Sequence, residues 1–342
     1  MSHIVFDQII SIENLYNAWN EFKKGKRHKS DVQVFEFHLE DNLFKLHWML
    51  KNGYYKHGTY QKFNINDPKL RVIHKASVQD RIVHHAIFKI LYPLFDQTFI
   101  FDSYSCRVDK GTHKAVKRLE LFAKNVSRDY QQPCFVLKCD ISKFFNSIDH
   151  EILKTIISKK LDDQKAMKLI NNIIDSYHTD NGKGVPLGNL TSQLFANIYM
   201  NKFDQHVKHK LKERKYIRYT DDFVIISNSE KHLLNLIPKI KFFLNHELQL
   251  ALHPRKVEIR KLSQGIDFLG YVILPHHKLL RTKSKKRMYR KIKTKCMQYK
   301  ELEIDQISLD QSIQSYYGML THCSSKGLKR KVINIISNTI DN

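Results

Sequence analysis

The chain has 342 residues, and its 58 Lys and Arg against 34 Asp and Glu give a formal net charge of +24 at pH 7. This charge indicates a polyanionic partner. Nucleic acid fits better than a membrane, because no apolar run reaches the roughly 18 residues of a spanning helix. Five cysteines without a Cys-x-x-Cys pair argue against a zinc site or a disulfide framework and favour a reducing compartment.

The first 65 residues are predicted to be helical at first and then mixed. Trp19 and Phe22 lie on a helix that leads into a basic run, residues 23–29. Such a run is usually a solvated loop, and RNA contact is the functional alternative. The first 15 residues carry acids and no Lys or Arg, so they do not form a secretory signal, and we expect a cytoplasmic protein.

Residues 134–139 form an apolar run that predicts a buried strand, and Asp140 ends it. An acid at the end of such a strand points into a cleft at the edge of the sheet. The structural alternatives for Asp140 are a helix N-cap or a strand terminator. Asp149 fits the N-cap role better, because a helical pattern starts at Glu151.

A Gly/Pro turn at residues 184–188 leads into a predicted helix, in which apolar residues recur near one face from Leu190 to Leu211. Helical segments within 151–177 and 231–247 are expected to cover one face of the sheet. The order along the chain is therefore a strand with an acid, then a turn and a helix.

Tyr219-Thr220-Asp221-Asp222 lies between the apolar runs 216–218 and 223–226, which predicts a β-hairpin with two carboxylates at its turn. Adjacent carboxylates repel each other, so keeping both ionised requires a counter-charge. Mg²⁺ supplies one, since it takes hard oxygen ligands and shares them with phosphate. The alternative is that Asp-Asp is simply good turn chemistry.

Near the C-terminus, residues 278–300 contain eleven Lys and Arg and no acid. Met288, Ile292 and Cys296 recur at a spacing of four, which predicts a basic amphipathic helix. Residues 315–320 then open a last helix pair. Because the chain ends soon afterwards, we expect no room for an RNase H, endonuclease or large maturase domain.

These motifs resemble the palm of reverse transcriptases. That family's first motif is an Asp followed five residues later by an aromatic, as in Asp140 and Phe145. Its second motif is a Gly/Pro loop that runs into a helix, and its third is Tyr-x-Asp-Asp. Further segments resemble its fingers motifs and its primer-grip hairpin: 71–73, 80–83, 103–107 and 265–271.

The resemblance covers about residues 69 to 271 in the family's order. It implies an α+β right-hand polymerase with fingers, a palm built on an antiparallel sheet, and a small helical thumb. The expected division of the chain is an N-terminal extension at 1–65, fingers at 66–130, palm at 131–275 and a helical thumb at 276–342.

The resemblance also implies an RNA-directed DNA polymerase that uses two Mg²⁺ ions, or Mn²⁺ in their place. The expected metal ligands are Asp140, Asp221, Asp222 and the carbonyl of Ile141, and the three aspartates are the catalytic residues. The expected dNTP-binding residues are Lys69, Arg71, Lys143, Phe144, Phe145, Leu187, Gly188 and Lys256. The expected template and primer contacts are Arg107, Gln193, Tyr219, Phe268, Leu269, Gly270, Lys285, Lys286, Arg287 and Arg290.

Two of these nucleotide contacts carry a specific role by resemblance. Phe145 is a large aromatic under the sugar, which should exclude a 2′-hydroxyl and make the substrate a dNTP; the alternative is that it is a core residue beside Phe144. Lys256 resembles a family lysine that protonates the pyrophosphate. Successive backbone N–H groups at Lys143, Phe144 and Phe145 could bind phosphate oxygens.

The chain departs from the common pattern at two places. Most reverse transcriptases carry Gln where this chain has Leu187, and Ser-Pro where it has Ser192-Gln193. An apolar residue followed by Gly-x-x-x-Ser-Gln resembles the enzymes of diversity-generating retroelements, which misincorporate opposite template adenines. Leucine can neither donate nor accept a hydrogen bond at the nascent pair. The alternative is that Leu187 is a packing residue.

This resemblance implies a bacterial or phage system in a bacterial cytoplasm. The expected partners are a structured template RNA, its cDNA, dNTPs and a small basic helical accessory variability protein, with no membrane. Two alternatives stay open. One is a compact bacterial reverse transcriptase of another lineage, such as a retron, intron-like or defence enzyme. The other is a non-enzymatic RNA-binding scaffold, against which the intact Asp140, Asp221 and Asp222 argue.

Overall fold

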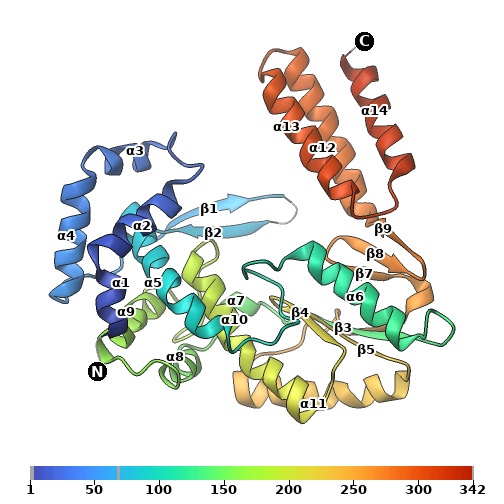
Figure 1. The fold of residues 1–342 in the computed structure, drawn as a ribbon, viewed down its shortest axis with the longest axis horizontal. Helices are drawn as coiled ribbons and strands as arrows, with labels where there is room; N and C mark the ends of the chain where they lie inside the picture. Colours follow the sequence, from blue (N-terminus) through green and yellow to red (C-terminus); the bar gives the residue numbers. More distant parts are fainter. Residues whose placement is uncertain (1–3, 68–69, 341–342) are drawn as a thin grey trace.

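The computed structural model describes residues 4–67 and 70–340, and it has the outline of a right hand (Figure 1). A helical lobe from the N-terminal part of the chain lies on one side. A four-stranded sheet flanked by helices forms the base, and a small sheet carrying a helix bundle rises on the other side. This is the α+β right-hand architecture that the motif order predicted.

The N-terminal lobe consists of helices packed around the long helix α5. Serines start two of these helices, because the side chains of Ser11 and Ser77 accept hydrogen bonds from backbone N–H groups of the first turn. Trp19 and Phe22 of α2 are buried, and their rings pack against Phe35 of α3 and His85 of α5, respectively. The elements are α1 (Ile4–Ile10), α2 (Ile12–Lys23), α3 (Ser30–Phe37), α4 (Leu39–Lys51), β1 (Gln61–Ile65), β2 (Arg71–Lys75) and α5 (Val78–Asp96).

The central sheet is antiparallel, with the strand order β4-β5-β3-β6. Its strands are β3 (Phe135–Cys139), β4 (Tyr216–Tyr219), β5 (Asp222–Ser227) and β6 (Glu258–Lys261). The two middle strands are apolar along most of their length, which suits strands covered on both faces. Cys139 pairs with Phe223 and Tyr219 pairs with Asp222, so the acids predicted at 140 and at 221–222 meet at one edge of the sheet.

Helices cover both faces of this sheet. One face packs on α11 (Glu230–Leu248) and the other on α6 (Thr112–Val126), as Figure 1 shows. The expectation that segments within 151–177 cover the sheet is wrong: α8 (His150–Ser158) packs on α10 (Leu190–Gln205), and α9 (Gln164–Asp175) packs on α8 and α1. Periodicity identifies an apolar helix face but does not identify the partner of that face.

The predicted N-cap of the helix after Asp149 is confirmed. The Asp149 side chain accepts a hydrogen bond from Ile152 N–H and caps α8, whereas Asp140 caps no helix. The remaining short elements are α7 (Phe144–Ser147), the π-helix His206–Lys210 that continues α10, and the 3₁₀ turn Leu262–Gln264.

The C-terminal part shares a second core with α6 and the central sheet. Met288, Ile292 and Cys296 of the basic helix are all buried, so the predicted amphipathic helix is confirmed. It packs against the last helix pair. The elements are β7 (Ile266–Phe268), β8 (Tyr271–Leu274), β9 (His277–Leu280), α12 (Thr282–Lys300), α13 (Gln306–Leu320) and α14 (Lys326–Ile340).

Two of the proposed segment boundaries fall inside hairpins: 65/66 follows β1 directly, and 275/276 lies between the paired strands β8 and β9. The fold therefore holds these neighbouring segments together, and the division into four segments stays a proposal. Within residues 4–67 and 70–340, every helix is either too short or too polar to span a bilayer.

Candidate active site

Three aspartates from two neighbouring strands meet at the edge of the central sheet. Asp140 directly follows β3, while Asp221 and Asp222 form the end of the β4–β5 turn. The strand register places Asp140 beside Asp222, because the preceding pair is Cys139 and Phe223. Asp140 and Asp222 both line a cavity of about 1110 Å³ between the sheet, the β1–β2 hairpin and α12.

The carboxylates at the turn are held in a partly buried position that disfavours their charge. Burial, together with the negative charges of Asp221 and Asp140, raises the pKa of Asp222 to about 6 against the opposing effect of Lys138. Burial also raises the pKa of Asp221, and Asp140 adds to this shift. Such a cluster needs additional positive charge to stay fully ionised.

Lys256 supplies part of that charge. Its Nζ lies 2.8 Å from Oδ2 of Asp140, and its side chain is 41% exposed to the cavity. The loop that carries Lys256 is fixed to the same strand end, because His253 N–H donates to the carbonyl of Asp140 at 2.8 Å. Arg71, at the start of β2, also lines the cavity and lowers the pKa of Asp221.

The donor chemistry of this cluster fits a divalent cation. Carboxylate oxygens are the ligands that Mg²⁺ prefers, and partly buried carboxylates with raised pKa values are stabilised by a bound cation. Within the part of the chain that the structure describes, no group of three or more His, Cys, Asp or Glu side chains is placed so that it could hold a metal ion. Instead, the Asp140 carboxylate accepts a hydrogen bond from Lys256 Nζ. The role of the Ile141 carbonyl stays a prediction.

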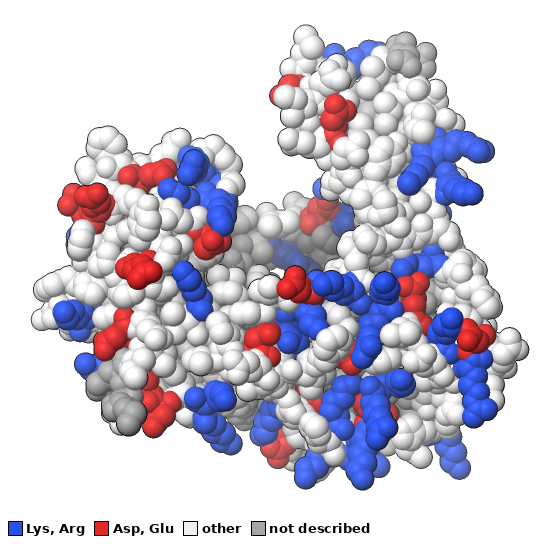
Figure 2. Space-filling view, in the orientation of Figure 1, with Lys and Arg blue, Asp and Glu red and all other residues white. Residues whose placement is uncertain are grey.

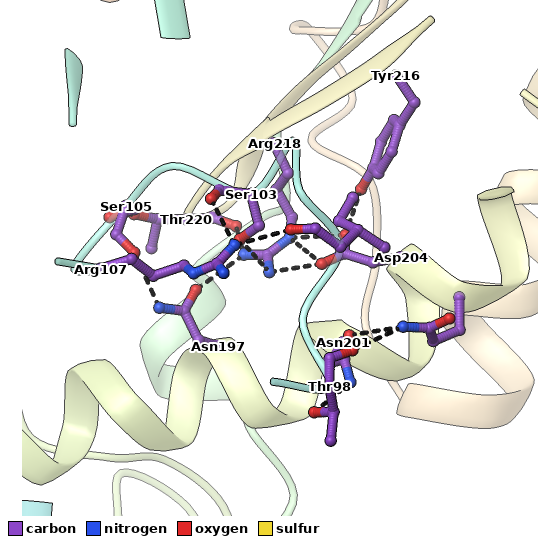
Figure 3. Close-up of polar contacts among 12 residues, drawn as sticks. Thr98, Ser103, Ser105, Arg107, Asn197, Asn201, Asp204, Tyr216, Arg218 and Thr220 are labelled. Carbon is purple, nitrogen blue, oxygen red and sulfur yellow. Dashed lines mark hydrogen bonds and ion pairs between the residues drawn. The ribbon is translucent and has the colours of Figure 1, made fainter. Parts of the chain in front are cut away.

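The turn that carries the two acids has an unusual backbone. Thr220 has φ 57°, in the left-handed region, which β-branched residues rarely adopt. A buried polar cluster lies beneath it: Arg218 donates to the Thr220 carbonyl at 3.0 Å and forms an ion pair with Asp204 of α10 (Figure 3).

Sequence reasoning missed this cluster, which also includes Ser103, Ser105, Asn197 and Tyr216. A signal was present in the sequence. Arg218 interrupts an apolar strand and Asp204 interrupts an apolar helix, and an isolated charge in a buried run requires a partner. Lys138, on β3, was also missed and lines the cavity.

Three of the predicted nucleotide contacts, Arg71, Leu187 and Gly188, lie on β2 and on the 184–188 loop that contacts it. Leu187 is partly buried, and its carbonyl accepts from His74 N–H of β2 at 3.0 Å. Gly188 has φ 106°, and a Cβ there would meet Ile73 Cγ2 at 2.7 Å, so only glycine fits this close approach. Lys69 lies outside the described residues.

Of the pair Phe144 and Phe145, Phe144 is the core residue and Phe145 is only partly buried. Phe144 is 2% exposed, whereas Phe145 is partly exposed and packs edge-on against it at 5.4 Å between ring centroids. Lys143 has φ 45° and precedes the short helix α7, so left-handed and helical residues follow each other, as in an anion nest. The steric role of Phe145 stays a prediction.

Several predicted template and primer contacts border the same cavity. Leu269 and Gly270, both with positive φ, form the two-residue turn of the β7–β8 hairpin. The cavity is also lined from the hairpin and from α12 by Leu269, Gly270, Lys286, Arg287 and Arg290. Residues of the palm, the hairpin and α12 therefore face one space.

Two other predicted contacts are placed elsewhere. Phe268 is 1% exposed and belongs to the core beneath α12, so its ring does not reach the cleft. The Arg107 guanidinium is held by Asp96 at 2.7 Å and by two backbone carbonyls, so it braces the loop before α6. Motif position predicted the neighbourhood of these residues and not the direction of their side chains.

The last predicted contacts lie at separate points of the surface. Gln193 is exposed on α10, and Lys285 lies on α12. Tyr219 is partly buried, and its hydroxyl accepts from Thr112 Oγ1 at 3.2 Å.

In the space-filling view, an open cleft separates the N-terminal lobe from the C-terminal bundle, and Lys and Arg gather below the bundle (Figure 2).

The family model described as "Reverse transcriptase (RNA-dependent DNA polymerase)" matches residues 56–273, well over half of the chain. Protein YkfC of Escherichia coli is 27% identical over 255 residues, which cover 64% of this chain and 65% of that protein. The group II intron-encoded protein LtrA of Lactococcus lactis is 23% identical over 77% of this chain and 54% of its own length.

The Retron Ec83 reverse transcriptase of Escherichia coli is 24% identical over 64% of this chain and 68% of its own length. This chain therefore spans between about half and two thirds of the length of these curated relatives. Among solved structures, telomerase from Candida albicans is similar with a TM-score of 0.51 and 12% identity, covering 85% of this chain and 56% of that one. That similarity shows the fold alone.

Proposed function

The chain belongs to the reverse transcriptase family, and from this premise we propose that it is an RNA-directed DNA polymerase that extends a primer with dNTPs on an RNA template. One observation carries the proposal: Asp140 and Asp222 line a cavity whose walls carry cations from β2, β3 and α12, and Asp221 adjoins Asp222 in the β4–β5 turn. A basic cleft that leads to a carboxylate cluster suits a polyanionic substrate and product.

In the proposed reaction a primer 3′-hydroxyl attacks the α-phosphate of a dNTP in line and displaces pyrophosphate. Two divalent cations, when bound by Asp140, Asp221 and Asp222, would stabilise the attacking and leaving oxygens. The contribution of the chain is mainly positioning and charge neutralisation. Arg71 places positive charge on the cavity wall for the triphosphate. Lys256 Nζ could give a proton to the leaving pyrophosphate.

The proposal is tested by primer extension with the purified full chain on a defined RNA template, with Mg²⁺ and dNTPs. Asp140→Asn should abolish extension, because it removes a charge from the cluster while keeping the size of the side chain. The matched control is Asp162→Asn, an exposed acid that precedes α9. A wild-type protein that binds RNA and makes no cDNA, also with its cognate RNA and accessory protein, would support the scaffold alternative.

We also propose, at the level of lineage, an error-prone enzyme of the diversity-generating type that copies a template RNA with an accessory variability protein. Leu187 supports it, because this apolar residue sits on the loop bonded to β2 beside the nucleotide contacts. Without a polar contact, discrimination at the nascent pair should weaken. The curated relatives support a second candidate, a compact bacterial enzyme of the intron or retron type.

Sequencing of the cDNA separates these lineages. Errors concentrated opposite template adenines would support the diversity-generating type, and faithful cDNA would support the other lineages. In the first case Leu187→Gln should lower the adenine error rate by about tenfold, which corresponds to ~1.4 kcal/mol of discrimination. Leu211→Gln is the matched control, because Leu211 is a partly buried leucine that directly follows the π-helix at the end of α10. An unchanged error spectrum in Leu187→Gln would refute the assigned role of this residue.

A further inference from the structure

A fully buried ion pair lies directly beneath the turn that carries Asp221 and Asp222. The side chains of Arg218, at the end of β4, and Asp204, on α10, are both 0% exposed, and their closest N–O distance is 2.7 Å. Burial works against the charge of Arg218, but the Asp204 carboxylate outweighs it and raises the Arg218 pKa. Apolar residues often stabilise a core as well as a buried ion pair does, so stability alone does not explain this one.

All three nitrogens of the Arg218 guanidinium donate hydrogen bonds. Nε donates to Asp204 at 2.8 Å, and Nη2 donates to both Asp204 and Ser103. Nη1 donates to Asn197 Oδ1 at 3.2 Å and to the carbonyl of Thr220 at 3.0 Å. One side chain thus joins α10, the loop before α6 and the catalytic turn (Figure 3). Lysine lacks this planar fork.

The group at the end of this network is the strained residue of the turn. Thr220 has φ 57°, and such conformations persist when the surrounding structure fixes them. Its carbonyl is held by Arg218, and its Oγ1 lies 2.6 Å from Ser105 Oγ. Ser105 is fixed in turn, since its carbonyl accepts from Asn197 Nδ2. Hydrogen bonds therefore hold both the backbone carbonyl and the side-chain hydroxyl of Thr220.

We propose that Arg218 is a positioning residue for the catalytic aspartates: it holds Thr220 in the left-handed conformation and thereby sets the place of Asp221 and Asp222. Ser105 is the second support of the same turn. This inference rests on the proposed polymerase function. It assigns no contact between Arg218 and substrate, because the guanidinium is fully enclosed.

The test measures single-nucleotide incorporation, RNA affinity, thermal stability and hydrogen exchange of residues 216–226 in full-length variants. Arg218→Lys should lower kcat by about a hundredfold, as expected for a displacement of about 1 Å. Ser105→Ala, which keeps the buried charges paired, should lower kcat by about fivefold, the size of one hydrogen bond. Both should keep the RNA affinity and the KM for dNTP, and both should speed exchange in the hairpin.

Two further variants separate positioning from plain stabilisation. Ser127→Ala removes a buried hydroxyl at the end of α6 and should leave kcat unchanged. Adding Thr220→Gly should partly rescue kcat in Arg218→Lys, because glycine adopts positive φ without support. A Ser105→Ala variant with wild-type kcat and hairpin exchange, or a double variant without rescue, would overturn the inference. An inactive wild-type protein would overturn the proposed function instead.

Discussion

Asp222→Asn should stabilise the protein in the absence of divalent metal, since it removes a carboxylate that the fold holds in an unfavourable place. Burial and the neighbouring acids raise the pKa of Asp222 to about 6 from an ordinary value of 3.8. At ~1.4 kcal/mol per pH unit, this difference corresponds to about 3 kcal/mol. The asparagine keeps the shape of the side chain and carries no charge to repel.

The sign of the pH dependence follows from this raised pKa. Below pH 3.8 Asp222 is protonated in both the folded and the unfolded chain, so wild type and variant should be equally stable. As the pH rises toward about 6, the unfolded chain loses the proton more readily, and the wild type loses stability relative to the variant. The full difference should be present at pH 8.

The assay is hydrogen-exchange protection of strands β3 and β5 at pH 8 and at pH 3.5 in EDTA, because exchange of core strands reports the free energy of opening. Asp162→Asn is the control for removing an exposed charge. Mg²⁺ should reduce the difference in stability between Asp222→Asn and wild type at pH 8, because wild type binds the ion more tightly than the variant and gains more stability from it. An Asp222→Asn variant no more stable than wild type at pH 8 in EDTA would refute this account of the site.

Three other changes test separate parts of the cleft. Phe145→Ala should raise the use of rNTPs relative to dNTPs by at least about tenfold, measured by competitive incorporation, because space opens for a 2′-hydroxyl. Replacing Arg287 and Arg290 together by Ala should lower the slope of log affinity against log salt by about 2, measured by RNA binding at several salt concentrations. Lys256→Met should shift the pH–rate profile to higher pH, because Lys256 lowers the pKa of Asp222.

Matched controls exist for each change. Phe243→Ala removes a partly buried aromatic from α11, and Lys239→Ala with Lys241→Ala removes two exposed cations from the same helix. Lys160→Met removes an exposed lysine beyond α8. Unchanged sugar discrimination, an unchanged salt slope or an unmoved pH profile would each contradict the role assigned to that residue.

The sequence alone predicted the parts of the fold that local patterns determine. The apolar run before Asp140 and the runs around the Tyr219–Asp222 turn have strand periodicity, so their strands and the meeting of the acids followed from the pattern and the resemblance. The buried positions of Met288, Ile292 and Cys296 followed from helical spacing alone. In each case the information lies within a few neighbouring residues.

The sequence did not predict features that depend on tertiary pairing or on side-chain direction. Arg218 and Asp204 lie fourteen positions apart on a strand and a helix, and only the packing of those elements joins them. Phe268 and Arg107 occupy predicted nucleic-acid motifs, yet one is buried in a core and the other is held by Asp96. A linear motif does not specify which way a side chain points.

The central claim is tested most directly by one single-turnover experiment on a preformed complex of the full chain with a primed RNA template. Wild type and Asp221→Asn are first matched for RNA affinity, and one dNTP is then added with Mg²⁺. Wild type should add the nucleotide, whereas Asp221→Asn should bind the RNA equally well and add none. Equal rates of addition by the two proteins would contradict the assignment of these carboxylates as the catalytic site.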